Sequence, residues 1–402
     1  MRSICTAIVA TLMLAETSLA ATIHVPTDYP TIQAAIGAAY DGDVILVAPG
    51  IYTSSGEAVA DTLGKTLTIE SLGGPSTTIL DGQGTRRGLY CSGESPAHVT
   101  VSGFTIQNGT PPTGQESDGG GILTIGDLTL SHCIIEYCQA GSQGAGLAAG
   151  THPFPTGQTV SIDNCTFQYN TAEYGGAVLA HDCNVSMTNC QVLNNTGTNN
   201  IGGAGLGHYV SGYTHSLENV TFSGNTSPGG TWGKAGAMSI RNTTNITMTG
   251  CTVTNNSSLV SGGGISYWYG ARFDPHTGLH PDGNPVSSKS RSRGDGMFVL
   301  SDCLIRGNST VGNGAGLSLE ASGTALIATI VCGNAPEQIN GPWYDGGDNF
   351  VAEKCMDDCP GDYTGDNYVN VDDLLHVITY WQNPYTVDDL LLVIANWQTS
   401  CP

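Results

Sequence analysis

The sequence predicts an all-β repeat solenoid with a small helical module at its carboxyl end. Three features of the chain of 402 residues support this prediction. Seven short β-rich runs recur between residues 100 and 335, and six of them end in Asn. Segments rich in Gly and Ala recur with them, and the run Val-Asp-Asp-Leu-Leu occurs twice near the carboxyl end. Repeats of this kind indicate stacked structural units rather than several globular domains.

The first 20 residues have the pattern of a secretory signal peptide. Arg2 gives a positive start, residues 4–15 an apolar run, and residues 18–20 a cleavage site of small residues. We therefore expect a mature chain that begins near residue 21 and is secreted, extracellular or held at a cell surface. No later stretch approaches the ~18 apolar residues that span a bilayer, so we expect no transmembrane segment.

The next segment predicts a short helix and the first strands. Ile32, Ala35, Ile36 and Ala39 form an apolar stripe of helical spacing shortly after Pro30. Such a helix would cover the open end of the first coil, whose strand edges would otherwise lack partners. Residues 43–47 and 65–69 read as strands.

The seven repeats predict one coil of a solenoid each. Their first positions are 32, 25, 30, 31, 52 and 26 residues apart, and apolar and polar residues alternate within most copies, as in a strand. Stacked coils bring equivalent positions to about 4.8 Å. The recurrent Cys should therefore form an internal column, the Asn a ladder at a turn, and the Gly-rich segments tight corners.

The Phe-x-x-Asn strand ends at Phe167–Asn170 and Phe222–Asn225, together with corners such as Gly175–Val178, resemble the repeat of chlamydial polymorphic outer-membrane proteins. More broadly, the pattern resembles a right-handed parallel β-helix of the pectate-lyase-like class. The resemblance implies a β-helix over residues 21–343, with an insertion at 268–296. Proteins of this fold include lyases, hydrolases, adhesins and inert stalks, so the fold alone assigns no activity.

Residues 344–359 read as a linker and residues 360–402 as a calcium module. Positions 1, 3, 5, 9 and 12 of a 12-residue loop carry oxygen ligands, the backbone carbonyl of position 7 completes the set, and a helix follows. The expected ligands are Asp362, Thr364, Asp366, Tyr368, Asn370 and Asp373.

The two helical halves resemble a type I dockerin, which implies Ca²⁺ and a cohesin-like or other protein partner. Thr364 and Asn367 depart from the family pattern, and the second half lacks loop ligands, so we expect one calcium site. The alternative is a solvated acidic turn whose carboxylates only favour the start of the helix.

The composition narrows the classes of ligand that this chain is expected to bind. The net charge of −22 disfavours nucleic acids and anionic polysaccharides as ligands. The insertion collects aromatic rings, His and cations, as sugar-binding loops do, and it is the candidate ligand site. An equally supported interpretation is that the insertion is an exposed loop without a specific function. The candidate residues are Trp268, Tyr269, Arg272, His276, His280 and Asp282.

We expect a protein that binds polysaccharide or surface glycan and uses its carboxyl-terminal module for protein attachment. The polygalacturonase motifs are absent, and no clear pectate-lyase signature is present. A polysaccharide lyase or glycoside hydrolase of the same fold is one alternative, with catalytic residues unknown. A cell-surface adhesin is the other.

Overall fold

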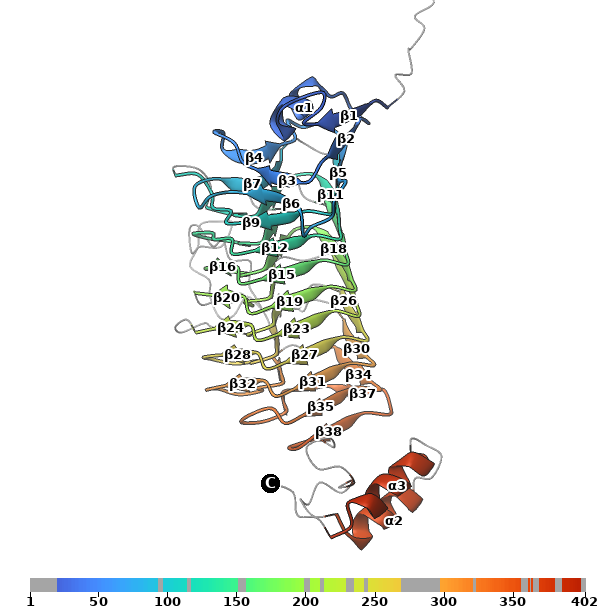
Figure 1. Cartoon of the computed structure of the whole chain (residues 1–402). Helices are drawn as coiled ribbons and strands as arrows, with labels where there is room; N and C mark the ends of the chain where they lie inside the picture. Colours follow the sequence, from blue (N-terminus) through green and yellow to red (C-terminus); the bar gives the residue numbers. More distant parts are fainter. Residues whose placement is uncertain are drawn as a thin grey trace, which may run out of the picture.

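The computed structural model shows a single stack of coils that is followed by two short helices (Figure 1). It describes residues 20–398, except residues 93–96, 114–116, 151–156, 199–202, 210–212, 229–234, 242–244, 269–296, 321–322, 356–360, 362, 364–368 and 380–384. The expected signal peptide, apart from Ala20, therefore lies outside the described residues.

Four parallel sheets run along the stack, and each coil adds a strand to three or four of them. The 12-stranded sheet contains β1 (Thr22–Val25), β2 (Val44–Val47), β5 (Leu67–Ser71), β8 (His98–Ser102), β11 (Asp127–Ser131), β14 (Thr159–Asp163), β18 (Asn184–Thr188), β22 (Thr214–Glu218), β26 (Asn245–Thr249), β30 (Phe298–Ser301), β34 (Thr324–Ile327) and β37 (Tyr344–Asp345). The 11-stranded sheet contains β3 (Gly50–Tyr52), β6 (Thr78–Asp81), β9 (Thr105–Gln107), β12 (Ile134–Glu136), β15 (Thr166–Gln168), β19 (Gln191–Leu193), β23 (Thr221–Ser223), β27 (Thr252–Thr254), β31 (Leu304–Arg306), β35 (Ile330–Cys332) and β38 (Phe350–Ala352).

The third sheet has ten strands, and the fourth has five strands of two residues each. The ten-stranded sheet contains β4 (Ala58–Asp61), β7 (Arg87–Cys91), β10 (Ile122–Thr124), β13 (Leu147–Ala149), β17 (Val178–His181), β21 (Leu206–Tyr209), β25 (Met238–Arg241), β29 (Ile265–Trp268), β33 (Leu317–Leu319) and β36 (Ile339–Asn340). The five-stranded sheet contains β16 (Thr171–Ala172), β20 (Thr196–Gly197), β24 (Thr226–Ser227), β28 (Ser257–Ser258) and β32 (Ser309–Thr310).

The register confirms one coil per repeat. Residue 134 pairs with residue 166, which pairs with residue 191, so the equivalent positions of successive copies lie side by side. Inward side chains build one continuous core that extends from Val25 to Val331. The all-β parallel solenoid predicted from the repeats is therefore confirmed.

The expected column and ladder are both present inside the solenoid. Cys133, Cys165 and Cys190 are buried thiols at equivalent positions. The Asn side chains are buried, and all but the last, Asn334, donate a hydrogen bond to the Asn of the next coil; Asn195 Nδ2 donates to Asn225 Oδ1 at 2.9 Å. A hydrogen-bonded amide can be buried at little cost, whereas an unpaired one cannot.

The expected cap is α1 (Ile32–Ala38), whose side chains Ile32, Ala35 and Ile36 are buried. Thr31 caps its amino end by accepting a hydrogen bond from Ala34 N at 3.1 Å. At the other end, Lys65 Nζ donates to the carbonyl oxygens of residues 36, 37 and 39 at 2.7, 3.1 and 2.7 Å. These contacts satisfy the last turn of the helix, whose carbonyl groups lack partners within it.

The last coil extends further than the sequence suggested. Strands β37 and β38 belong to the sheets although they lie within residues 344–359, which we expected to be a linker. A disulfide joins Cys332 of β35 to Cys355 and closes a segment of 23 residues. This bond ties the chain that follows β38 to the body of the solenoid.

The helical module contains α2 (Val371–Thr379) and α3 (Val387–Ala395), which pack against each other. Val377 and Val393, at equivalent positions of the duplicated sequence, are both fully buried between them. Among the described residues, no helix has the length and apolar character needed to cross a membrane.

Candidate functional site

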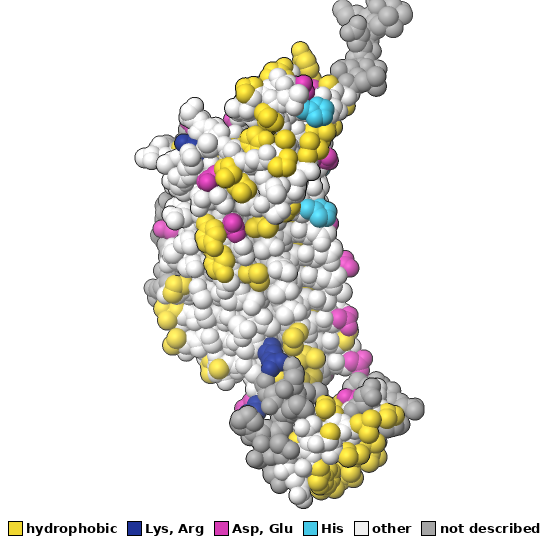
Figure 2. Space-filling model, viewed as in Figure 1, with side chains coloured by type: hydrophobic (Ala, Val, Ile, Leu, Met, Phe, Trp, Pro, Cys, Tyr) yellow, Lys and Arg dark blue, Asp and Glu magenta, His cyan; other side chains and the backbone are white. Residues whose placement is uncertain are grey.

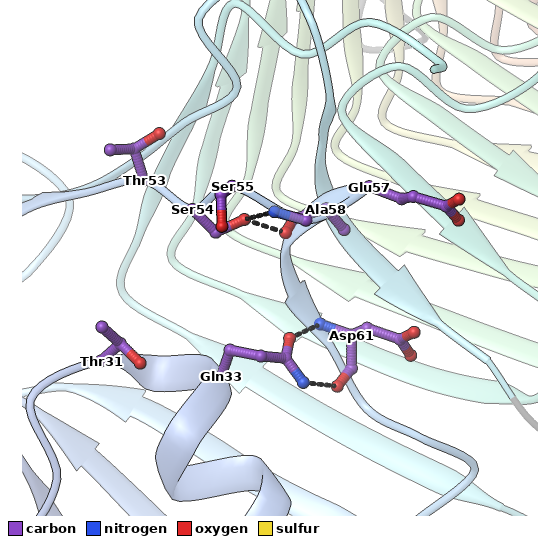
Figure 3. Close-up of a pocket in the computed structure, with 9 residues that line it drawn as sticks. Thr31, Gln33, Thr53, Ser54, Ser55, Glu57, Ala58 and Asp61 are labelled. Atoms are coloured by element: carbon purple, nitrogen blue, oxygen red, sulfur yellow. Dashed lines mark hydrogen bonds between the residues drawn. The ribbon is translucent and has the colours of Figure 1, made fainter. Parts of the chain in front are cut away.

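A cavity of about 440 Å³ lies at the amino-terminal end of the solenoid. One wall is the start of α1, with Thr31 and Gln33, and the opposite wall is the segment that joins β3 to β4 (Figure 3). The complete lining is Thr31, Gln33, Thr53, Ser54, Ser55, Gly56, Glu57, Ala58 and Asp61. The lining side chains carry four hydroxyl groups, one amide and two carboxylates, and no Lys or Arg is among them.

Gln33 fixes the start of α1 to the end of β4. Its Oε1 accepts a hydrogen bond from Asp61 N at 2.7 Å, and its Nε2 donates to Asp61 O at 3.0 Å. This two-point contact joins residues that are 28 positions apart. Ser54 orders the opposite wall in a similar way, because its Oγ donates to Ala58 O and accepts from Gly56 N at 3.1 Å.

Two carboxylates line the cavity. Figure 3 shows the side chains of Glu57 and Asp61 extending to the same side of the site. Asp61 Oδ1 accepts hydrogen bonds from Leu63 N at 2.9 Å and from Ser92 Oγ. These bonds hold the carboxylate in one orientation at the end of β4.

A second candidate surface lies where strands β12 and β15 of the 11-stranded sheet end. The rings of Tyr137 and Tyr169 stack at a centroid distance of 5.2 Å and an interplanar angle of 6°. They are 51% and 45% exposed, so both rings keep contact area for a ligand. Beside them, Gln168 Nε2 donates to Glu136 Oε2 at 2.6 Å.

The carboxylate of Asp81 belongs to the same sheet. Its partial burial would raise its pKa, but hydrogen bonds from Gln83, Gln107 and Asn108, together with the charge of Arg86, lower the pKa below the ordinary value. Asp81 is therefore a stable anion on this face at neutral pH.

Most of the ligand loop predicted from sequence lies outside the described residues. This holds for Tyr269, Arg272, His276, His280 and Asp282. Trp268, in contrast, is the last residue of β29. Its side chain is partly buried, and its Nε1 donates a hydrogen bond to Ser239 Oγ at 3.1 Å. The structure thus places Trp268 in a sheet rather than in a free loop.

Of the six expected calcium ligands, Asn370 and Asp373 are described, and Asp362, Thr364, Asp366 and Tyr368 lie outside the described residues. Asp373 is fully buried, and its Oδ2 accepts a hydrogen bond from Asn370 N at 2.8 Å. Asn370 Oδ1 accepts from Asp372 N at 2.7 Å. A buried carboxylate beside an amide oxygen is compatible with a hard cation, and both residues also stabilise the start of α2. Among the described residues, no three His, Cys, Asp or Glu side chains form a metal site.

The second half of the module has a different polar contact. Tyr363 Oη donates to Asp389 Oδ1 at 2.7 Å. Burial and the bond to Asp389 raise the pKa of Tyr363. Partial burial would raise the pKa of Asp389, but the hydrogen bonds from Tyr363 and Thr386 lower it. Asp389, the counterpart of Asp373, thus binds a tyrosine hydroxyl.

The two helices expose the same apolar positions. Their exposed fractions match pair by pair: 52% and 57% for Val371 and Val387, and 54% for both Leu375 and Leu391. Figure 2 shows hydrophobic side chains gathered over this module. Exposed apolar clusters of this kind are typical of protein contact surfaces.

The sequence did not predict the cavity at the amino-terminal end. Its only local signal is the polar run of residues 53–57 between two short strands. The contribution of Gln33 depends on a contact across 28 residues, which no local pattern reveals.

One known protein family agrees with this architecture. The family described as "Right handed beta helix region" matches residues 87–284. Among solved structures, pectate lyase Pel9A has a TM-score of 0.45 at 12% identity, over 88% of this chain and 84% of that chain. Pectin methylesterase from carrot has a TM-score of 0.37 at 12% identity, over 85% and 90% of the two chains. Pectin methyl esterase of rice weevil has a TM-score of 0.37 at 13% identity, over 82% and 88%.

No curated protein sequence matches the chain. At TM-scores below 0.5, the likenesses to these enzymes carry no inference about activity. The register of the strands and the family match to residues 87–284 together identify the fold of this chain as a right-handed parallel β-helix.

Proposed function

We propose that this chain is an exported protein that binds polysaccharide or glycan and attaches to a protein partner through its carboxyl-terminal module. The cavity between α1 and the β3–β4 segment carries the binding part of the proposal. Its walls present hydroxyl, amide and carboxylate groups, and backbone hydrogen bonds to Gln33 and Ser54 hold those walls in place.

Sugars are recognised through many directed hydrogen bonds, and a lining of this composition supplies them. The volume of about 440 Å³ lies within the usual range of roughly 300–1,000 Å³ for ligand sites. Because the groups are already held by the protein, little conformational entropy is lost on binding. The exposed rings of Tyr137 and Tyr169 offer a second contact for a longer chain.

The attachment part rests on the duplicated helices. Val371, Leu375, Val387 and Leu391 are each more than half exposed, which suits contact with an apolar patch of another protein. The resemblance to a type I dockerin supports calcium dependence, since calcium in the loop before α2 would hold that helix in place. Asn370 and Asp373 would contribute two of the oxygen ligands.

Binding is tested with the full mature chain against immobilised polysaccharides of neutral, anionic and cationic character. We expect retention on at least one class, with no new reducing ends and no unsaturated products. Cleavage would assign the protein to the lyase or hydrolase alternative. Absence of retention on every class would contradict the proposal.

The calcium site is tested by titration calorimetry on the full chain. We expect about one equivalent of Ca²⁺ to bind and Asp366→Ala to abolish it. Asp348→Ala, an exposed acid outside the helical module, is the matched control and should leave binding unchanged. Equal calcium binding by both variants would refute the assignment of the loop.

A further inference from the structure

We propose that the cavity at the amino-terminal end selects an amino sugar with a free, protonated amine, and that the cationic polysaccharide built from such sugars is the ligand. This inference rests on the proposed function and names the substrate class of the same site. Four observations lead to it.

The first observation concerns the hydrogen bonds of the Asp61 carboxylate. Its Oδ1 accepts two hydrogen bonds, whereas within the described part of the chain Oδ2 has no hydrogen-bond partner. The residue is only partly exposed, and its backbone is held at both N and O by Gln33. A fixed carboxylate oxygen in a ligand cavity is a strong acceptor for an ammonium group, because charge-assisted hydrogen bonds are stronger than neutral ones.

The second observation concerns the nearby cations, none of which is among the lining residues of the cavity. Lys65 donates to three carbonyl oxygens of α1, and the buried Arg87 donates to Asp118 O. Arg86 reaches Thr53 Oγ1 at the edge of the cavity, but it also donates to Gln83, and its charge lowers the pKa of Asp81. A cationic ligand would therefore meet the Asp61 carboxylate with no Lys or Arg among the lining residues to oppose it.

The third observation is the charge of the whole chain, with 34 acidic and 12 basic residues. Such a field attracts cations and repels anionic polymers over distances of about one Debye length. A polysaccharide with many amines would gain from this field at every unit near the surface.

The fourth observation separates a sugar from a basic peptide. The lining contains four hydroxyl side chains and one amide but only one apolar side chain, that of Ala58. Lysine side chains carry long apolar stems that prefer apolar surface. A hydroxylated ring with one amine matches both the hydroxyl lining and the Asp61 carboxylate.

The test is a titration of the full mature chain with three short oligomers of equal length: glucosamine, N-acetylglucosamine and glucose. We expect the glucosamine oligomer to bind at least about tenfold more tightly than the other two, since its amine forms a charge-assisted bond. Rising salt should reduce this preference.

Asp61→Asn is the decisive variant, because Asn keeps an oxygen that can accept from Leu63 N and Ser92 Oγ while it removes the charge. We expect it to lose most of the preference for glucosamine but to retain a folded melting profile. Asp302→Asn, which removes an exposed acid far along the chain, should keep the preference.

The possible outcomes are distinct. Equal binding of the three oligomers would overturn the amine inference and leave glycan binding standing. Binding of no oligomer and of no polysaccharide would overturn both. An unchanged preference in Asp61→Asn would exclude this cavity as its origin, and equal affinity for oligolysine would exclude the sugar class.

Discussion

Removal of one amide from the internal Asn ladder should destabilise the solenoid far more than removal of a surface amide. Asn225 is fully buried. Its Oδ1 accepts from Asn195 N at 3.0 Å and from Asn195 Nδ2 at 2.9 Å, and its Nδ2 donates to Val192 O at 2.8 Å. Asn225→Ala would leave two buried donors of Asn195 without this acceptor. At about 1–3 kcal/mol for each, the loss in unfolding free energy is about 2–6 kcal/mol.

Asn184→Ala is the matched control. Its Oδ1 accepts one exposed hydrogen bond, from Thr214 N at 2.9 Å, and water can replace it. We expect a cost below about 1 kcal/mol.

Urea unfolding followed by circular dichroism measures the difference, provided that the slope with denaturant is unchanged. Because long repeat arrays can unfold in parts, hydrogen exchange at the Asn195 amide gives a local readout, which should become faster in Asn225→Ala. Equal midpoints for the Asn225 and Asn184 variants would refute the reasoning.

Two further predictions follow from close packing and from pH. Gly146→Ala would place a Cβ 2.5 Å from Ala177 O and should lower the free energy of unfolding by about 1–3 kcal/mol. Gly37→Ala in α1 meets no atom within 4 Å and should raise the free energy of unfolding by about 0.5–1 kcal/mol. Thermal melting of both variants checks these opposite signs. Partial burial would raise the pKa of Asp389, but the hydrogen bond from Tyr363 helps to hold it below the ordinary value of 3.8. The ionised Asp389 therefore contributes its full stabilisation above pH 3.8, and this stabilisation is lost as the pH falls through the lower pKa of the folded state. Acid titration of the module by NMR should show this loss, and Tyr363→Phe should reduce it; identical acid profiles would contradict the assignment.

The parts of the fold that sequence predicted are those with local signals. The Cys, Asn and Gly positions repeat once per coil, and each repeat needs only its neighbours to bury its core. The stripe from Ile32 to Ala39 likewise predicts α1 from adjacent residues. The strands of the ten-stranded sheet were harder to predict. In β4, for example, Ala58, Val59 and Ala60 are all buried, so apolar and polar residues do not alternate.

The candidate site was less predictable than the fold. Aromatic and charged residues directed attention to residues 268–296, and Trp268 proved to belong to a strand. The cavity instead depends on Gln33 and Asp61, which meet only after the chain has completed a coil. Hydroxyl-rich segments are common in loops, so residues 53–57 gave no distinctive signal.

The long interval between two of the repeats shows how this protein tolerates added sequence. Asn256 N reaches Asn308 Oδ1 at 2.9 Å across 52 positions, and Asn195 N reaches Asn225 Oδ1 at 3.0 Å across only 30. The pairing of residue 252 with residue 304 continues the same register as its neighbours. Since each coil pairs only with the coils above and below it, extra residues between β29 and β30 leave the pairing intact. The architecture can therefore acquire or exchange surface loops in evolution, and in the laboratory, while the scaffold beneath them stays the same.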